Sequence, residues 1–275
     1  MNSTIKSMPV WKWALLLLAS FILSFLMYGI SQAVLDYTPD GWAEWPVATA
    51  LAAAMLALYA LFVKWIEKHP AGDIPLKRCV VDSACGLCTG ALYFVVLVLI
   101  MWLFGIYHFE GFGTDKPLGI VSAFFMFLMV GAGEEIIFRG VLFRWIDEKF
   151  GFTWALAVSS LLFGLIHIFQ PGASLWSSLA IAVEAGLLLG AAYKYSGTLW
   201  LPIGIHWAWN FTQGNIFGFA VSGGDAGTSL IQAKTSGPKI LSGGAFGAEA
   251  SLLALLLGLA LSIWFIVKVV RKSQS

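Results

Sequence analysis

The chain has 275 residues, of which 59% are hydrophobic and only 11% are charged, and its formal net charge is +1. A soluble domain carries about 25% charged residues, so this composition excludes a soluble enzyme and a soluble binding module. The small net charge also excludes a nucleic-acid partner, because no face has enough Lys and Arg to neutralise phosphates. The lipid bilayer is therefore expected to be the main solvent of this protein.

Apolar stretches of about 20 residues, the length that crosses a bilayer as a helix, recur along the chain. Eight spans are expected, at residues 11–35, 46–66, 84–107, 118–145, 152–170, 174–194, 198–219 and 249–268. The predicted fold class is therefore all-α, a polytopic membrane helix bundle with about eight transmembrane helices. Residues 220–248 are rich in Gly and Ser, which predicts a flexible loop on the non-cytoplasmic side.

Charged residues in the predicted loops indicate the orientation of the bundle. Basic residues occur before the first span, between the second and third, after the fourth and sixth, and at the C-terminus, whereas the first loop is acidic. The basic residues are Lys6, Lys12, Lys64, Lys68, Lys77, Arg78, Arg144, Lys149, Lys194, Lys268, Arg271 and Lys272, and the first loop holds Asp36, Asp40 and Glu44. The third loop has Glu110 and Asp115 against Lys116. Because Lys and Arg favour the cytoplasmic side, we expect an integral, multi-pass membrane protein with both termini cytoplasmic.

Small residues mark two expected helix contacts. Gly186 and Gly190 form a GxxxG pattern in the sixth span, which lets another helix approach closely. Cys85 and Cys88 form a CxxC pattern at the start of the third span. Such a pair is typical of metal or redox sites, but at the start of an apolar run we interpret it as small residues at a helix contact.

Ionisable side chains deep inside the spans are few, and such groups usually face a cavity or a partner. The candidates are Glu134, Glu135, Arg139, His167, Glu184 and His206, together with the amide of Asn210. Glu135 and Arg139 are four residues apart, so they share a helix face and are expected to pair, which lowers the cost of placing both in the membrane. Glu134 points about 100° away on the same helix and is expected to face a cavity.

Two further spans supply residues that suit hydrolysis. His206 and Asn210 are also four apart and project from one face of the seventh span, and His167 comes from the fifth. A carboxylate in an apolar pocket suits a general base that takes a proton from water, and a histidine can orient that water or protonate the leaving group. The Asn210 amide can stabilise an oxyanion. One Glu and two His are also a known zinc ligand set, so the metal content stays open.

Other functions use the same residue types. Proton relays and transporters also place Glu and His in membrane spans, so an ion-coupled transporter with Glu134, Glu184 and His167 as a proton path is the first alternative. A non-catalytic membrane scaffold or bacteriocin-immunity protein is the second. The sequence has no HExxH pattern of a zinc protease, no GxSxG elbow of a serine hydrolase and no GxGD pattern of a membrane aspartyl protease.

Three stretches in the fourth, fifth and seventh spans resemble the motifs of one family. Residues Gly133–Gly140 resemble the EExxxR motif of the CPBP family, the CAAX proteases and bacteriocin-processing enzymes, also called Abi proteins. Phe163–His167 is similar to its FxxxH motif, His206–Asn210 to its HxxxN motif, and Leu199–Pro202 to the usual lead-in of the third motif. The resemblance divides the chain into three N-terminal spans at 1–117, a catalytic core at 118–219, the loop at 220–248, and a last span with a basic tail at 249–275.

The resemblance implies an intramembrane endopeptidase that acts on membrane-embedded or lipidated peptides; the best-known branch is the type II CAAX prenyl endopeptidase. Carried over by motif, Glu134 would activate water with help from His167, and His206 and Asn210 would form an oxyanion hole. Glu135 and Arg139 would support the site. The family has been described both as metal-dependent and as a metal-independent glutamate protease. The amide of Asn210 favours the second description, so no cofactor is firmly expected, with zinc as the alternative.

Two features stand apart from these motifs. At 1.5 Å per residue, straight helices would put Glu134 about 24 Å from the outer edge and His167 about 22 Å from the inner edge of a core about 30 Å thick. We therefore predict that the fourth helix is strongly tilted or extends beyond the bilayer. Glu184 belongs to no motif, and we expect it either to line the cavity or to pair with a neighbour.

Overall fold

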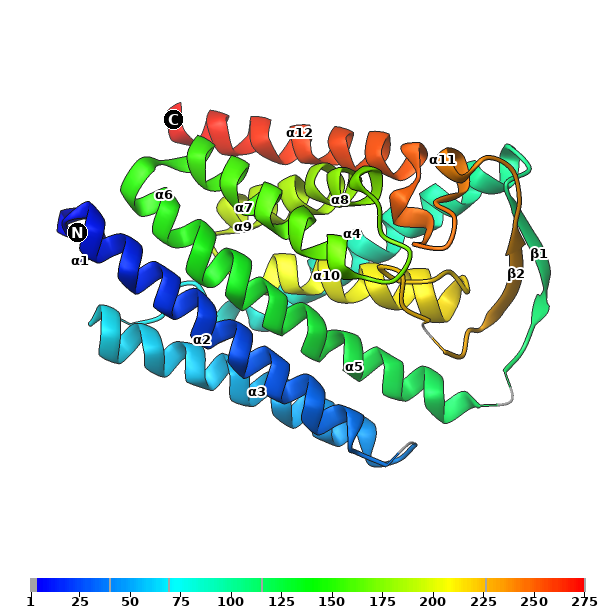
Figure 1. Cartoon of the computed structure of the whole chain (residues 1–275), viewed down its shortest axis with the longest axis horizontal. Coiled ribbons are helices and arrows are strands. Elements are labelled where there is room, and N and C mark those ends of the chain that lie inside the picture. The colour runs from blue at the N-terminus through cyan, green and yellow to red at the C-terminus, as the bar shows by residue number, and fades with distance from the viewer. Residues whose placement is uncertain (1–3, 40, 69, 115, 226, 275) are drawn as a thin grey trace.

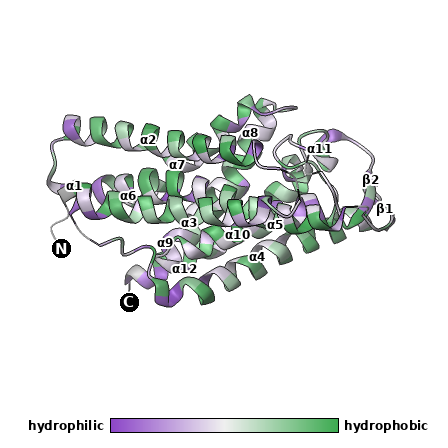
Figure 2. Cartoon of the chain, turned by 90° about the horizontal axis from the view of Figure 1, so that it is seen from below, coloured by the Kyte–Doolittle hydropathy of each residue, from purple (hydrophilic) through white to green (hydrophobic). Residues whose placement is uncertain are grey.

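The apolar runs of the sequence form helices that lie side by side in a computed structural model, which describes residues 4–39, 41–68, 70–114, 116–225 and 227–274. Asp40 and Asp115, two of the loop charges used to predict the orientation, lie outside the described residues. Hydrophobic residues cover the helices along most of their length, and strongly hydrophilic residues gather mainly near the two ends of the bundle (Figure 2). This distribution is the one expected of helices that cross a bilayer.

Most of the helices follow one another with short connections (Figure 1). Several helical runs contain a π-helical turn. Before the first strand they are α1 (Thr4–Ser7), α2 (Val10–Asp36), α3 (Glu44–Phe62), η1 (Val63–Glu67) and α4 (Leu76–Leu103). The centre of the chain forms α5 (Pro117–Glu135), η2 (Ile136–Phe143), α6 (Arg144–Phe150), α7 (Phe152–Ile166), η3 (His167–Phe169), α8 (Leu175–Ile181), η4 (Ala182–Gly186), α9 (Leu187–Ser196), α10 (Trp200–Phe211) and η5 (Thr212–Ile216). The chain ends in α11 (Lys239–Ser242), η6 (Ala248–Ala250) and α12 (Leu252–Gln274).

All eight predicted spans fall on helices, and the all-α membrane bundle is confirmed. Within the described residues, 7 helical runs are long and apolar enough to cross a membrane. The seventh predicted span is shorter, because α10 has 12 residues and η5 adds 5. Most of α10 is buried, and it packs between α4, α5 and α9, so it lies inside the bundle.

Both termini lie at the same end of the bundle, and strands β1 (Tyr107–Phe112) and β2 (Ile231–Thr235) lie at the other (Figure 1). This arrangement agrees with an even number of crossings. Which end faces the cytoplasm stays a prediction, as does the division of the chain at residues 117, 219 and 248.

Glycines allow α10 to approach α4 closely. A Cβ added to Gly204 would lie 2.5 Å from the carbonyl oxygen of Ser83 and 3.0 Å from Cα of Gly86, which no side chain permits. Cys85 and Cys88 are instead exposed, so the prediction that they form the helix contact is wrong. They flank Gly86 on the helix, and only the glycine side of α4 meets α10.

The GxxxG pattern in the sixth span is a helix contact, as predicted. A Cβ on Gly186 would lie 2.8 Å from Cα of Ser160 on α7, and one on Gly190 would lie 2.9 Å from a methyl carbon of Leu156. The α7 helix, which carries His167 at its end, therefore packs directly on η4 and α9.

The fourth span is one continuous helical run, Pro117–Phe150, with 34 residues. At 1.5 Å per residue this run is about 51 Å long, well over the about 30 Å of a bilayer core. It must therefore tilt or extend beyond the bilayer, in agreement with the prediction. Near the end of the run that is predicted to face the cytoplasm, Arg144 joins it to η1. The two terminal nitrogens of Arg144 donate to the two carboxylate oxygens of Glu67, each at 2.5 Å.

The predicted loop at 220–248 contains secondary structure that the sequence analysis did not expect. Strand β2 pairs antiparallel with β1, from Tyr107 opposite Thr235 to Phe112 opposite Ile231, and α11 follows. Each strand has only five or six residues, and its partner lies more than a hundred positions away, so neither is recognisable alone.

Candidate active site

The first motif lies at the junction of α5 and η2. Glu134 and Glu135 are the last residues of α5, and Arg139 lies in η2. Glu135 and Arg139 are fully buried, and Nη1 of Arg139 donates to Oε1 of Glu135 at 2.8 Å, so the predicted pair is confirmed. Nη2 of Arg139 also donates to the carbonyl of Gly186 at 3.1 Å. π-Helical turns often occur at functional sites. The π-helical turn η2 contains Arg139, whose hydrogen bond to Gly186 joins η2 to η4.

His206 of the third motif lies between the two glutamates. Its Nδ1 is 2.9 Å from Oε1 of Glu135, and its Nε2 is 3.9 Å from Oε2 of Glu134. Because the Glu135 carboxylate only accepts, Nδ1 carries the proton of that bond. Nε2 then has a lone pair when the ring is neutral and a donor N–H only when the ring is charged.

Glu134 has one occupied and one unoccupied carboxylate oxygen. Oε1 accepts a hydrogen bond from the hydroxyl of Tyr28 at 3.2 Å. Oε2 is buried and has no hydrogen-bond partner among the described residues, and it is the oxygen that faces His206. The carboxylate therefore presents a free lone pair toward His206. That Glu134 faces a cavity stays a prediction.

His167 begins η3, directly after α7. Its Nδ1 lies 2.6 Å from the carbonyl oxygen of Phe163, so Nδ1–H donates and Nε2 keeps its lone pair in the neutral ring. The Phe163 ring centroid is 4.9 Å from that of His167 and 5.9 Å from that of His206. The second motif thus supplies both a histidine and the aromatic ring against which both histidines pack.

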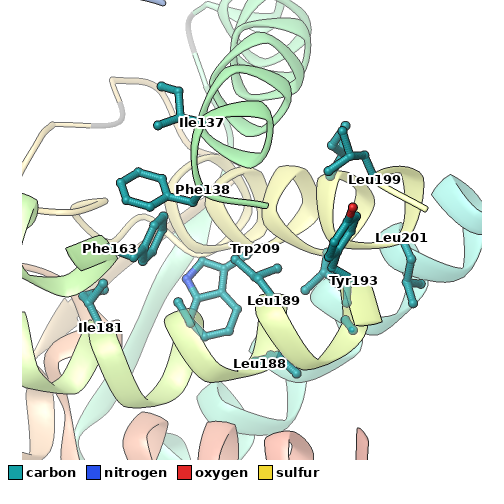
Figure 3. Close-up of a cluster of buried hydrophobic side chains, with 14 of the residues drawn as sticks. Ile137, Phe138, Phe163, Ile181, Leu188, Leu189, Tyr193, Leu199, Leu201 and Trp209 are labelled. Carbon is teal, nitrogen blue, oxygen red and sulfur yellow. The ribbon is translucent and has the colours of Figure 1, made fainter. Parts of the chain in front are cut away.

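Phe163 also lies under the guanidinium of Arg139, whose Cζ is 4.6 Å from the ring centroid. Phe138 packs edge-on against the same ring, as their arrangement in Figure 3 shows. Charged and aromatic groups of α5–η2, α7–η3 and α10 therefore meet around one buried phenylalanine. Asn210 is buried one helical turn after His206 on α10.

Glu184 lies outside this cluster. It is fully buried in η4, its Oε2 accepts from the Tyr93 hydroxyl at 3.3 Å, and it packs against Gly258 of α12. Of the two roles left open by the sequence, the structure shows the paired one. Tyr93 in turn stacks on Trp209, with ring centroids 4.2 Å apart.

Tyr28 and Glu249 are two residues near the motifs that the sequence analysis missed. Glu249, in η6, is buried and accepts from the indole N–H of Trp209, the neighbour of Asn210, at 3.2 Å. The backbone N–H of Ser222 donates to the other oxygen of the Glu249 carboxylate. Its position at the start of a span was the only sequence signal.

Zinc stays the alternative stated from the sequence. In the part of the chain that the structure describes, no three His, Cys, Asp or Glu side chains are grouped as metal ligands. In His167 and His206 the Nδ1–H group is donated to another acceptor, so Nε2 keeps its lone pair in each neutral ring and can bind a water proton or, as in metal-ligating histidines, a metal ion.

The comparisons with known proteins agree with the motif resemblance. Residues 116–212 match the family model described as type II CAAX prenyl endopeptidase Rce1-like, and this segment contains all three motifs. The resemblance stated from the motifs is therefore confirmed. The matched segment covers α5 to α10, while α2, α3, α4 and α12 lie outside it.

A relative from Bacillus subtilis (strain 168), named "Putative membrane peptidase YdiL", is 28% identical over 110 residues. The match covers 38% of this chain and 42% of the relative, so the chain matches less than half the length of that protein. No solved structure matches the chain. At the level of the family, the resemblance is to membrane proteases.

Proposed function

We propose that this protein is an intramembrane endopeptidase that hydrolyses a peptide bond of a membrane-embedded or lipid-modified substrate with a water molecule activated by Glu134. The observation that carries the proposal is the free Oε2 of Glu134, 3.9 Å from Nε2 of His206. This separation is too long for a direct hydrogen bond and suits one water oxygen hydrogen-bonded to both atoms.

In the proposed reaction, Glu134 acts as the general base. The water oxygen attacks the carbonyl carbon of the scissile bond while its proton passes to Oε2 of Glu134. The lone pair on Nε2 of His167 accepts the second hydrogen bond of the water and helps to orient it. Collapse of the tetrahedral intermediate breaks the C–N bond, and the proton held by Glu134 passes to the leaving amine.

His206 and Asn210 stabilise the negative charge on the oxygen of the tetrahedral intermediate. Nε2 of His206 can donate to the oxyanion when the ring is charged, and carboxylates of Glu134 and Glu135 flank that ring. The side-chain amide of Asn210, one turn further on α10, supplies a second donor. Such preorganised donors are usually the largest single contribution to acyl-transfer catalysis.

Glu135 and Arg139 fix the orientation of His206. The single oxygen Oε1 of Glu135 binds both Arg139 and His206, so it fixes which nitrogen of His206 faces Glu134. Arg139 anchors this carboxylate to the backbone of η4 and to the Phe163 ring. Neither residue needs to contact the substrate for this role.

The substrate class follows from the place of the site in the bundle. The helices that carry the motifs are apolar enough to cross a membrane or are buried among such helices, so peptides embedded in or anchored to the bilayer reach the site most directly. The resemblance to prenyl endopeptidases makes a prenylated peptide the first probe.

The test is cleavage of a quenched prenylated peptide by the purified protein in lipid nanodiscs, with and without a strong metal chelator. We expect cleavage that the chelator leaves unchanged, and slower cleavage of the same peptide without its prenyl group. Activity that is lost to the chelator and restored by zinc would contradict a metal-free mechanism.

Two further outcomes of this assay oppose the protease proposal itself. If neither prenylated peptides nor transmembrane peptides are cleaved, the proposed activity is wrong. Substrate-dependent proton flux in liposomes would then support an ion-coupled transporter. An undiminished cellular role after replacement of both Glu134 and His206 would instead support a non-catalytic scaffold.

A further inference from the structure

We propose that Tyr28 and Gln32, on α2, form a positioning pair that orients the Glu134 carboxylate for water activation. The inference deepens the proposed function and rests on it. The hydroxyl of Tyr28 donates to Oε1 of Glu134 at 3.2 Å, and Nε2 of Gln32 donates to that hydroxyl oxygen at 2.7 Å. Both residues lie on a helix outside the segment that matches the endopeptidase family.

The order of donors gives this chain of hydrogen bonds one direction. The Gln32 amide occupies a lone pair of the Tyr28 hydroxyl oxygen, so the hydroxyl proton is directed to Glu134. Oε1 of Glu134 is thereby engaged, and Oε2 is left to face His206. The pair therefore selects which oxygen of the carboxylate serves as the base.

The close packing of α2 against α5 supports the same role for Tyr28. Gly133, the residue before Glu134, has no side chain, and a Cβ there would clash with the Tyr28 ring. The ring therefore lies directly against the backbone of α5 beside the carboxylate that it binds. A side chain at residue 133 would push Tyr28 away from Glu134.

Tyr28 also differs from the other hydroxyl-bearing residues of α2. The hydroxyls of Ser20, Ser24 and Ser31 return to carbonyls of α2 itself, whereas Tyr28 reaches across to α5. Most of α2 is exposed and apolar, as expected of a helix at the lipid-facing edge of the bundle. A polar contact from such a helix to the candidate base is therefore a specific feature of this site.

The first test compares Tyr28→Phe with Tyr37→Phe, a matched control in which the hydroxyl removed is exposed, at the end of the same helix. Losing one hydrogen bond to a charged group corresponds to a roughly ten- to hundredfold change, so we expect kcat to fall by about that factor in Tyr28→Phe, with KM within about twofold.

The groups that face Glu134 are Tyr28 from α2, His206 from α10, and Glu135 and Arg139 from its own helical run. A merely structural role for Tyr28 would lower the unfolding temperature and leave kcat of the folded protein unchanged. Cleavage by Tyr28→Phe at the wild-type kcat would overturn the proposal.

The second test is a double-mutant cycle with Gln32→Met, which keeps the length of the side chain and removes its donor. We expect a smaller loss of kcat than in Tyr28→Phe. The double variant should be no slower than Tyr28→Phe alone, because Gln32 acts only through the Tyr28 hydroxyl. Losses that multiply in the double variant would show two independent effects and contradict the positioning pair.

An infrared measurement separates failure of this inference from failure of the proposed function. The carboxylate stretching band that disappears in Glu134→Gln should shift in Tyr28→Phe and stay unchanged in Tyr37→Phe. This readout needs no turnover, so it tests the contact even if the wild type cleaves nothing. A Glu134 band that is identical with and without the Tyr28 hydroxyl would overturn the inference.

Discussion

Glu134→Gln is expected to lower kcat by at least about a thousandfold, toward the upper part of the range for removal of a general base. Glutamine keeps the shape of the side chain and can still accept the Tyr28 hydroxyl at Oε1. Its neutral amide cannot take the proton of a water molecule at the position of Oε2. We expect KM and the unfolding temperature to stay close to those of the wild type.

The measurement is single-substrate cleavage in nanodiscs at saturating peptide, alongside thermal unfolding. Glu110→Gln is the matched control, since Glu110 lies on β1 in an exposed ion pair with Lys234. A Glu134→Gln protein that retains more than about a tenth of wild-type kcat would rule out Glu134 as the general base, given the factor expected for that role.

Arg139→Met is expected to cause the largest loss of stability at the site. Removing one partner of a buried ion pair costs about 3–5 kcal/mol, because the other charge is left without its partner. Here Glu135 would keep only His206 as a donor, and two carbonyls of η4 would lose the guanidinium. The measurement is the unfolding midpoint in detergent or lipid, with the exposed Arg271→Met as control.

The double variant Arg139→Met, Glu135→Leu separates stability from catalysis. Replacing a whole buried pair by apolar groups is often close to neutral, so most of the lost stability should return. Activity should not return, because His206 also loses the carboxylate that orients it. Single-variant stability equal to that of the wild type, or wild-type cleavage by the double variant, would each refute the structural role given to this pair.

The parts of the site that the sequence predicted are those governed by helix geometry. Glu135 and Arg139 pair because residues four apart share a helix face, and that relation holds without knowledge of the fold. The same rule places His206 and Asn210 on one face of α10. The fold class also followed from composition, since bilayer-length apolar runs leave helices as the available structure.

The parts that could not be predicted depend on contacts between distant segments. Tyr28 meets Glu134 across 106 positions of the chain, and nothing in the sequence around an apolar, lipid-facing helix marks that tyrosine. Strands β1 and β2 are visible only as a pair. At the α4–α10 contact, the CxxC pattern drew attention to the cysteines, whereas the close approach requires the glycine between them.

The central claim is that Glu134 activates water and does not itself attack the peptide bond, and oxygen-18 labelling in a single turnover tests it most directly. Enzyme in excess would cleave the lipidated peptide in labelled water, and mass spectrometry would examine both the new carboxylate and the Glu134 side chain. We predict one labelled oxygen in every new carboxylate and none in Glu134. An unlabelled first-turnover product, with label appearing in Glu134, would show that the glutamate is the nucleophile and would contradict the mechanism.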